Sequence, residues 1–422
     1  MSNYVEARRR PFGGDARNER AGLTVAGNPA EGLERAAYYA LLGFVALLPF
    51  SIFGSELLLT ITGLLWLTLV VRGHERFEAP GMFWPLAAYA GATLVASLFS
   101  VDPETSFIDC KQLLLFSIVP IAYRLLPGRR ALTVVDVIIT VGAISAVIGV
   151  VQFGILEFDS LGQRPRGLLG MYMTYSGQLM LIACTAAARV LFRKDDRLWT
   201  ALVMPALIAA LAATLSRNAW VGACVGIGLL FIIRDFRLFA LVPVALAGFI
   251  AFAPAQMTDR LYSSFRVKHL RHDTAATEAS LLSNRDRLAM IRSGFRIIKK
   301  DPLTGVGPDM VVSVYASYRD PNAVQQLNSH LHNVPLQIAA ERGLPALAIW
   351  LWFIVMLIRD FVKNRMKADP SLAYGALAVT VAMIAAGMFE YNFGDSEFLM
   401  LFLVLVTLPY AATRSTPASP PA

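Results

Sequence analysis

Apolar residues follow one another in long runs along this chain, and short polar stretches separate the runs. A helix that crosses a bilayer needs about 20 mostly apolar residues. Runs of this kind fall at about 36–54, 56–71, 82–100, 112–127, 133–155, 171–192, 199–215, 219–233, 238–256, 334–358, 372–391 and 397–412. The pattern predicts an all-α polytopic membrane protein with about 12 transmembrane helices.

One connection between these runs is much longer than the others. It is the stretch of 77 residues from 257 to 333, between the ninth and tenth apolar runs. The other connections are short, which is typical of neighbouring helices in a bundle. We therefore divide the chain into an N-terminal tail, nine helices, a loop domain, three helices and a C-terminal tail: 1–35, 36–256, 257–333, 334–412 and 413–422.

Composition agrees with this pattern. Hydrophobic residues make up 56% of the chain and charged residues 16%, whereas a soluble domain is roughly 25% charged. A disordered chain and a water-soluble enzyme are therefore excluded for the bulk of the sequence. Cys184 and Cys224 lie inside apolar runs and Cys110 lies alone, so no disulfide framework or metal cluster is predicted. The polar residues 1–35 are too long and too acidic for the start of a cleavable signal peptide, so the first run is expected to act as an uncleaved anchor.

The net charge of +8 does not indicate nucleic acid, because the cations follow a topological pattern. With the N-terminus in the cytoplasm, the short cytoplasmic loops carry sixteen lysines and arginines. The short external loops then carry only Lys111, Arg164, Arg166 and Arg217. Positive residues concentrate in cytoplasmic loops. Both termini are therefore predicted in the cytoplasm and the long loop outside.

External arginines run against this bias and are the first candidates for function. Arg217 lies in Leu-Ser-Arg-Asn-Ala-Trp, between two apolar runs. Ionisable groups at membrane depth are costly and usually face a cavity or a partner, although an arginine in a tight turn also reaches the headgroups by snorkelling. Arg166 allows the same two interpretations, and we assign Arg164 to a solvated loop.

The long loop contains a predicted amphipathic helix over residues 284–300. Apolar residues recur there at helical spacing beside a stripe of cations: Leu288, Ile291, Phe295 and Ile298 beside Arg285, Arg292, Arg296 and Lys299. A basic amphipathic helix typically lies on a membrane surface, which fits the last three cations. Arg285, in the predicted first turn, is the better candidate for a specific contact. The Gly305-Val306-Gly307 segment is predicted to be a turn.

His332 is the candidate for proton transfer, because histidine titrates near neutrality and is the commonest general base. His330, two residues away, is expected to point elsewhere and to be structural. The outer side carries no motif for a divalent metal, and no Walker A or serine-hydrolase motif occurs in the chain. No cofactor and no metal are therefore expected. Arginines with one histidine suit a phosphate or pyrophosphate held by guanidinium groups.

Three segments together resemble the O-antigen ligase family of bacterial inner-membrane proteins, which is similar to the O-antigen polymerases. They are "LSRNAW", "SNRDRLAMIRSGFRIIKKDPLTGVGPDM" and "HNVPLQIAAERGLPAL", which follow one another within residues 214–346. Asn284, Ala289 and Pro345 depart from the family's usual residues. These departures leave the proposed catalytic positions filled, but they leave the choice between Arg285 and Arg287 open.

The resemblance implies a GT-C-like glycosyltransferase in the inner membrane of a Gram-negative bacterium, with its active site on the periplasmic side. It implies an O-antigen glycan on undecaprenyl pyrophosphate as the donor, and a sugar hydroxyl of lipid A–core as the acceptor. His332 then matches the catalytic histidine. Arg217 and Arg285, with Arg166 as a looser match, correspond to pyrophosphate-binding arginines. Arg287 and Asn333 are additional candidates.

Three hypotheses follow from this reading. The first is a metal-independent, inverting ligase that works among membrane lipids and does not bind nucleic acid. The second has the same donor chemistry but another acceptor, as in an O-antigen or exopolysaccharide polymerase or a protein O-oligosaccharyltransferase. The third is a transporter of an anionic solute, which needs basic residues in broken helices at mid-membrane depth.

Overall fold

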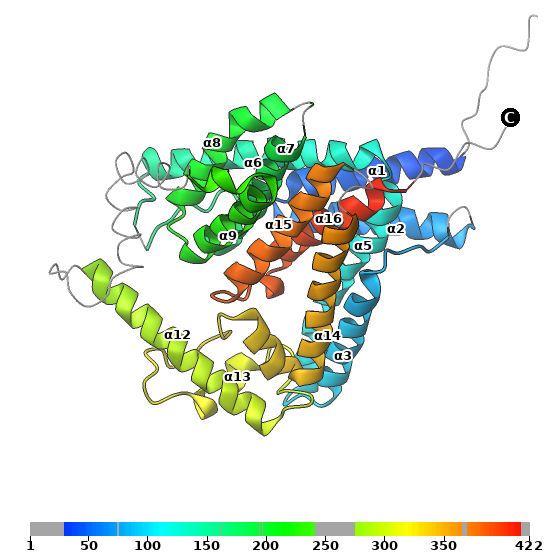
Figure 1. The fold of residues 1–422 in the computed structure, drawn as a ribbon. Helices are drawn as coiled ribbons and strands as arrows, with labels where there is room; N and C mark the ends of the chain where they lie inside the picture. The colour runs from blue at the N-terminus through cyan, green and yellow to red at the C-terminus, as the bar shows by residue number, and fades with distance from the viewer. Residues whose placement is uncertain are drawn as a thin grey trace, which may run out of the picture.

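The computed structural model describes residues 29–73, 76–160, 162–193, 195, 197–240, 275–364 and 369–414. Within these ranges the regular structure is entirely helical (Figure 1). The helices are α1 (Pro29–Leu47), α2 (Ile52–Val71), α3 (Phe83–Leu98), α4 (Pro103–Asp109), η1 (Cys110–Ser117), α5 (Ile118–Leu125), α6 (Arg129–Gly154), α7 (Tyr172–Phe192), α8 (Arg197–Ala213), α9 (Arg217–Arg234), η2 (Phe236–Ala240), α12 (Ala275–Lys300), α13 (Val311–Tyr318), α14 (Val334–Asn364), α15 (Pro370–Gly387), η3 (Asn392–Gly394) and α16 (Ser396–Ala412).

Seven helices of the described ranges are long and apolar enough to cross a membrane. They are Ile52–Val71, Pro103–Leu125, Arg129–Gly154, Tyr172–Phe192, Arg217–Arg234, Val334–Lys363 and Pro370–Gly387. Three further apolar helices, α3, α8 and α16, are shorter. The chain is thus a polytopic membrane protein. Most of the ninth predicted run, 238–256, lies outside the described residues, and every other predicted run overlaps a helix.

The centre of the bundle is formed by α7, α15 and α16, and α9 packs closely on α15. The close approach depends on two glycines of α9. A Cβ atom on Gly222 would lie 2.8 Å from the carbonyl oxygen of Ala382, and one on Gly226 would lie 2.9 Å from that of Ala378. Small residues let helix backbones approach each other within a membrane. This contact holds the start of α9, where Arg217 lies, beside the loop that follows α15.

The long helix α14 is interrupted near its start, at Gly343, whose backbone (φ 80°, ψ 171°) is not helical. The 302–307 segment packs into this break. Val306 and Gly307 donate backbone hydrogen bonds to the carbonyls of Ala340 and Glu341, at 3.0 and 2.9 Å. Backbone groups at membrane depth need such partners. The Gly305-Val306-Gly307 segment is therefore an irregular connection that packs on α14.

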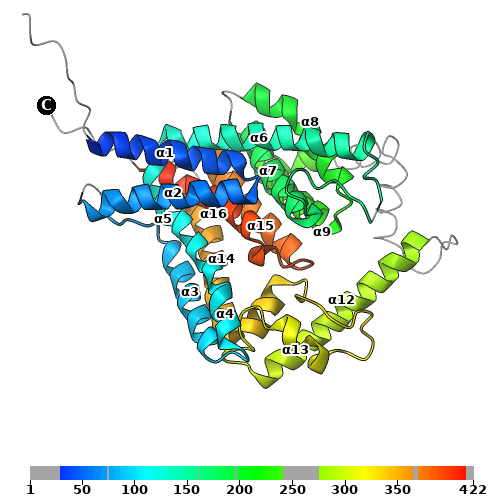
Figure 2. The same cartoon turned by 180° about the vertical axis from the view of Figure 1, so that it is seen from behind.

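Helix α12 lies apart from the main bundle and is joined to it through α13 and the start of α14 (Figure 2). It begins at Ala275, so it is longer than predicted and Arg285 does not lie in its first turn. The predicted apolar face was also displaced: Leu288 and Phe295 are half exposed or more, whereas Met290 and Ile297 are buried. The buried pair packs on Val311 and Tyr315 of α13 and on Leu331 and Leu336.

The cations on the outer face of α12 have protein partners. Arg296 pairs with Asp320 at 3.2 Å, and Arg292 approaches the same carboxylate at 3.9 Å. Both arginines were expected to meet lipid headgroups. The contacts with buried Asp320 instead tie α12 to the loop after α13. These arginines therefore help to fix the helix that carries Arg287 in a preceding turn.

Candidate functional site

His332 lies in a short, well-anchored segment just before α14. The backbone N–H of Leu331 donates to the side chain of Gln337 at 2.7 Å. Asn333 accepts from the N–H of Leu336 at 2.9 Å and donates to the carbonyl of Met388 at 3.1 Å. Asn333 thereby caps α14 and also fixes the segment to the loop after α15. His332 has φ 49°, an uncommon backbone conformation for a non-glycine residue, which the neighbouring contacts maintain.

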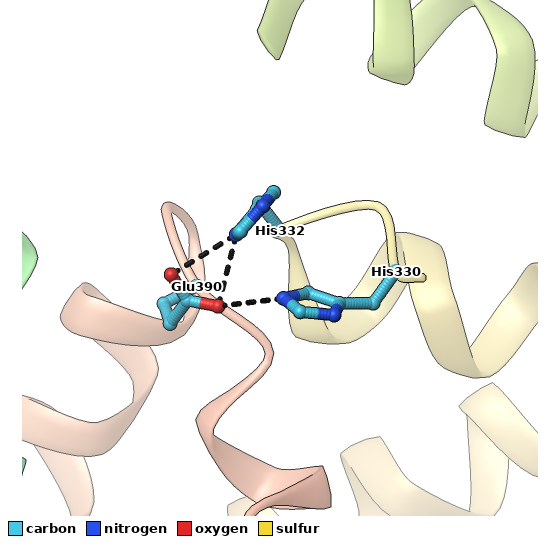
Figure 3. A group of neighbouring side chains, drawn as sticks. All are labelled: His330, His332 and Glu390. Atoms are coloured by element: carbon cyan, nitrogen blue, oxygen red, sulfur yellow. Dashed lines mark hydrogen bonds and ion pairs between the residues drawn. The ribbon is translucent and has the colours of Figure 1, made fainter. Parts of the chain in front are cut away.

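Two histidines converge on one carboxylate, that of Glu390 (Figure 3). His332 Nδ1 lies 2.9 and 3.0 Å from the two oxygens of Glu390, and His330 Nε2 lies 3.1 Å from Oε1. The backbone N–H of Tyr391 donates to the same oxygen at 3.1 Å. Burial acts to raise the pKa of Glu390, but the hydrogen bonds from His330 and His332 outweigh it and the net pKa is lowered. Glu390 is therefore an ionised acceptor for both imidazoles.

The expectation that His330 points away from His332 was wrong. It assumed a helix, whereas residues 329–333 form an irregular segment, and the two imidazole rings lie 4.2 Å apart. The sequence reasoning also missed Glu390 as their partner, because 58 and 60 residues separate it from His332 and His330. No short motif signals contact across such a distance.

His330, His332 and Glu390 are also residue types that bind metal ions, and their potential ligand atoms lie within 4.8 Å of one another. Two nitrogen or oxygen atoms that share a tetrahedral zinc ion at about 2.0–2.1 Å lie roughly 3.3 Å apart. The separations here are 2.9–3.1 Å, which are hydrogen-bond lengths. The group is packed for direct hydrogen bonding between carboxylate and imidazole.

Two cavities meet at His332. An apolar cavity of about 610 Å³ runs between α9 and α12 and is lined by Trp220, Val221, Cys224, Val225, Leu288 and Ile291, among others. A polar cavity of about 460 Å³ is lined by Arg164, Tyr172, Asp286, Gln325 and Glu390, among others. Four residues line both: Arg217, Asn218, Arg287 and His332. The junction therefore combines two cations, an amide and an imidazole.

The structure distinguishes Arg287 from Arg285, a choice that the sequence left open, and it differs from the expectation that Arg166, and not Arg164, belongs to the site. Arg287 lines both cavities, while Arg285 is exposed and lines neither. Residues two positions apart project from nearly opposite sides of a helix. In the 163–167 loop, Arg164 lines the polar cavity and stacks on Tyr172, with 4.2 Å to the ring centroid. Arg166 lies outside that cavity lining, and its guanidinium is over Phe158.

The electrostatics of the junction favour an anion. Arg164, Arg217 and Arg287 all line the polar cavity, and Arg217 is the first residue of α9. The N-terminus of a helix carries a partial positive charge and unsatisfied N–H groups. Guanidinium groups bind phosphate oxygens in pairs. A phosphate or pyrophosphate group is therefore the chemistry that this junction accommodates best, with His332 beside it.

The fold and site together define a polytopic helical membrane protein with an arginine–histidine site at the meeting point of an apolar and a polar cavity. Residues 201–351 match a family model described as O-antigen ligase. This part of the chain is therefore similar to the O-antigen ligase family. The matched range contains Arg217, Arg287 and His332, whereas Arg164 and Glu390 lie outside it. No curated protein matches the chain.

Proposed function

We propose that this protein is an O-antigen ligase. It transfers an O-antigen glycan from undecaprenyl pyrophosphate to a sugar hydroxyl of lipid A–core, at the periplasmic face of the bacterial inner membrane. The observation that carries the proposal is the junction itself, where Arg217, Arg287 and His332 line an apolar and a polar cavity at once. The match of residues 201–351 to the O-antigen ligase family model supports it.

The two cavities suit substrates that are part lipid and part sugar. A polyprenyl chain is entirely apolar, and the cavity between α9 and α12 offers it Val221, Val225, Leu288 and Ile291. A glycan needs hydrogen-bonding groups, and the polar cavity offers Gln325 and Asp286 among its lining residues. The pyrophosphate connects the two halves of the donor, so it belongs at the junction.

The reaction that we propose is a direct displacement with inversion. His332 Nε2 accepts the proton of the acceptor hydroxyl as its oxygen bonds to the anomeric carbon of the glycan. The bond between that carbon and the phosphate oxygen breaks, and the electron pair leaves with the pyrophosphate. Arg217 and Arg287 stabilise the charge that grows there, which is effective because both are already in place. A pyrophosphate leaves without a general acid.

A reconstituted assay tests this function. Purified protein in detergent, given the lipid-linked donor and lipid A–core, should form glycosylated lipid A–core without any ion or solute gradient. We expect the same rate in excess EDTA, because the chemistry assigned to the arginines replaces that of a divalent metal. Transfer that stops with EDTA and returns with zinc would contradict the metal-independent mechanism and make His330, His332 and Glu390 metal ligands. A protein that yields no product under any condition would favour a transporter.

The alternative acceptors are separated in cells. Deletion of the gene for a ligase should leave lipopolysaccharide as unladdered core, with glycan accumulating on the lipid carrier. If the gene encodes a polymerase, its deletion should leave core that bears one repeat unit. We expect the first banding pattern on gels and its reversal by the intact gene. A single-repeat band, or unchanged lipopolysaccharide with loss of a glycosylated protein, would assign the other acceptor.

A further inference from the structure

The contacts around Glu390 determine which nitrogen of each imidazole carries hydrogen. An ionised carboxylate only accepts hydrogen bonds, so His332 Nδ1 and His330 Nε2 are the protonated nitrogens. His332 Nε2 is then left with its lone pair. That nitrogen is the one able to take a proton from a substrate, and the residue lines both cavities. The tautomer of His332 thus depends on Glu390.

His330 contacts the same carboxylate from another side. Its Nε2 donates to Oε1 at 3.1 Å, and Ser329 Oγ lies 2.8 Å from its Nδ1. His330 lines a separate cavity of about 170 Å³ together with Thr174, Asp395 and Glu390. His330 is not among the lining residues of the two cavities that meet at His332, so we assign it no contact with the reacting atoms.

The burial of Glu390 makes these donors necessary. Its side chain is 10% exposed, and a buried carboxylate is costly unless several donors satisfy it. His330, His332 and the backbone N–H of Tyr391 supply them. Loss of His330 would leave Oε1 with fewer donors and the carboxylate freer to move. A variant that keeps an aromatic ring at this position, and with it the 4.2 Å ring contact to His332, therefore reports on the route through Glu390.

We infer that Glu390 is a positioning residue for His332, and that His330 acts on His332 through the same carboxylate. The inference rests on the proposed function, in which His332 is the base. Glu390 holds the imidazole in the tautomer with a free Nε2 and stabilises the imidazolium that forms when the hydroxyl proton arrives. The proton stays on Nε2 during the displacement, and the carboxylate remains ionised.

The inference is tested with the purified full-length chain in the ligation assay. In Glu390→Gln we expect kcat to fall by about 10–100-fold with little change in KM, because part of the roughly 10²–10⁴-fold effect of a general base is lost. Glu390→Asp keeps the charge and should recover part of the rate. Glu104→Gln is the matched control, because Glu104 is an exposed carboxylate at the start of α4, and it should behave as wild type.

The pH profile of kcat distinguishes positioning from a purely structural effect. Without the negative charge of Glu390 the imidazolium is less stable, so the base stays unprotonated to lower pH. The acid limb of the profile should therefore move to lower pH in Glu390→Gln. The other charged groups that face this cavity are Arg164, Arg217, Asp286 and Arg287, and they are unchanged in the variant. A structural defect would lower the rate without moving the limb.

A double-mutant cycle tests the action of His330. His330→Phe alone should lower kcat, but it should cost little more once Glu390 is already glutamine, since residues that act through one group are not additive. Wild-type kcat and an unmoved pH profile in Glu390→Gln, with an inactive His332→Asn, would overturn the inference and leave the proposed function standing. Full activity in His332→Asn would overturn the function itself. If Glu390→Gln does not fold, wild-type rates in both Glu390→Asp and His330→Phe overturn the inference.

Discussion

Replacement of His332 by asparagine should lower the ligation rate by about 10²–10⁴-fold, the usual contribution of a general base. The acceptor hydroxyl would then have no nitrogen positioned to take its proton. The binding of the donor should persist, because Arg217 and Arg287 remain. The measurement is the initial rate of glycosylated lipid A–core formation by purified protein, together with retention of the labelled donor on the protein.

Asparagine is the better substitution at this position, and alanine serves as the comparison. The backbone of His332 has φ 49°, and asparagine adopts this region more readily than most residues. Alanine would add backbone strain to the loss of the imidazole. We expect both variants to be inactive and His332→Asn to be recovered in higher yield. A near-normal rate in His332→Asn would contradict the assignment of the base.

Arg217→Gln and Arg287→Gln should each lower kcat/KM by about 10²–10³-fold, the loss typical when one preorganised donor to a growing negative charge is removed. Both side chains line the junction of the two cavities, where we assign the pyrophosphate. Glutamine keeps a polar side chain but is shorter, and it removes the charge and the paired N–H donors. The measurement is again the initial ligation rate over a range of donor concentrations.

Arg285→Gln is the matched comparison, because it changes the same residue type two positions away on α12. Arg285 is exposed and outside both cavity linings, so we expect a rate close to wild type. The resemblance to the family, by contrast, points first to Arg285. Severe loss in Arg285→Gln with normal activity in Arg287→Gln would reverse the assignment and show that α12 turns in the working enzyme.

The helices could be predicted from the sequence because apolar length is a local property. Runs such as 171–192 and 372–391 correspond closely to α7 and α15. The break in α14 at Gly343 was not predicted, because it depends on the 302–307 segment packing against it. Apolar length also says nothing of which helices neighbour each other, so the contact of α9 with α15 required the structure.

The site could be predicted only where its signal was local. Arg217 stood out as a charge between two apolar runs, and His332 stood out by its residue type and motif. The choice between Arg285 and Arg287 depends on the rotation of α12, which the buried Met290 and Ile297 fix. The helical spacing of Leu288 and Phe295 suggested a different buried face. Large apolar residues that line a cavity or contact lipid cannot be told from core residues in a sequence.

The shared walls of the two cavities have a consequence for inhibition. Because Arg217, Asn218, Arg287 and His332 belong to both, a compound seated between them would obstruct the polyprenyl half and the glycan half of the donor together. A short alkyl chain ending in a diphosphonate has the required form, with its tail along α9 and its head against the guanidinium groups. Such a compound would compete with the donor, so a higher donor concentration should relieve the block.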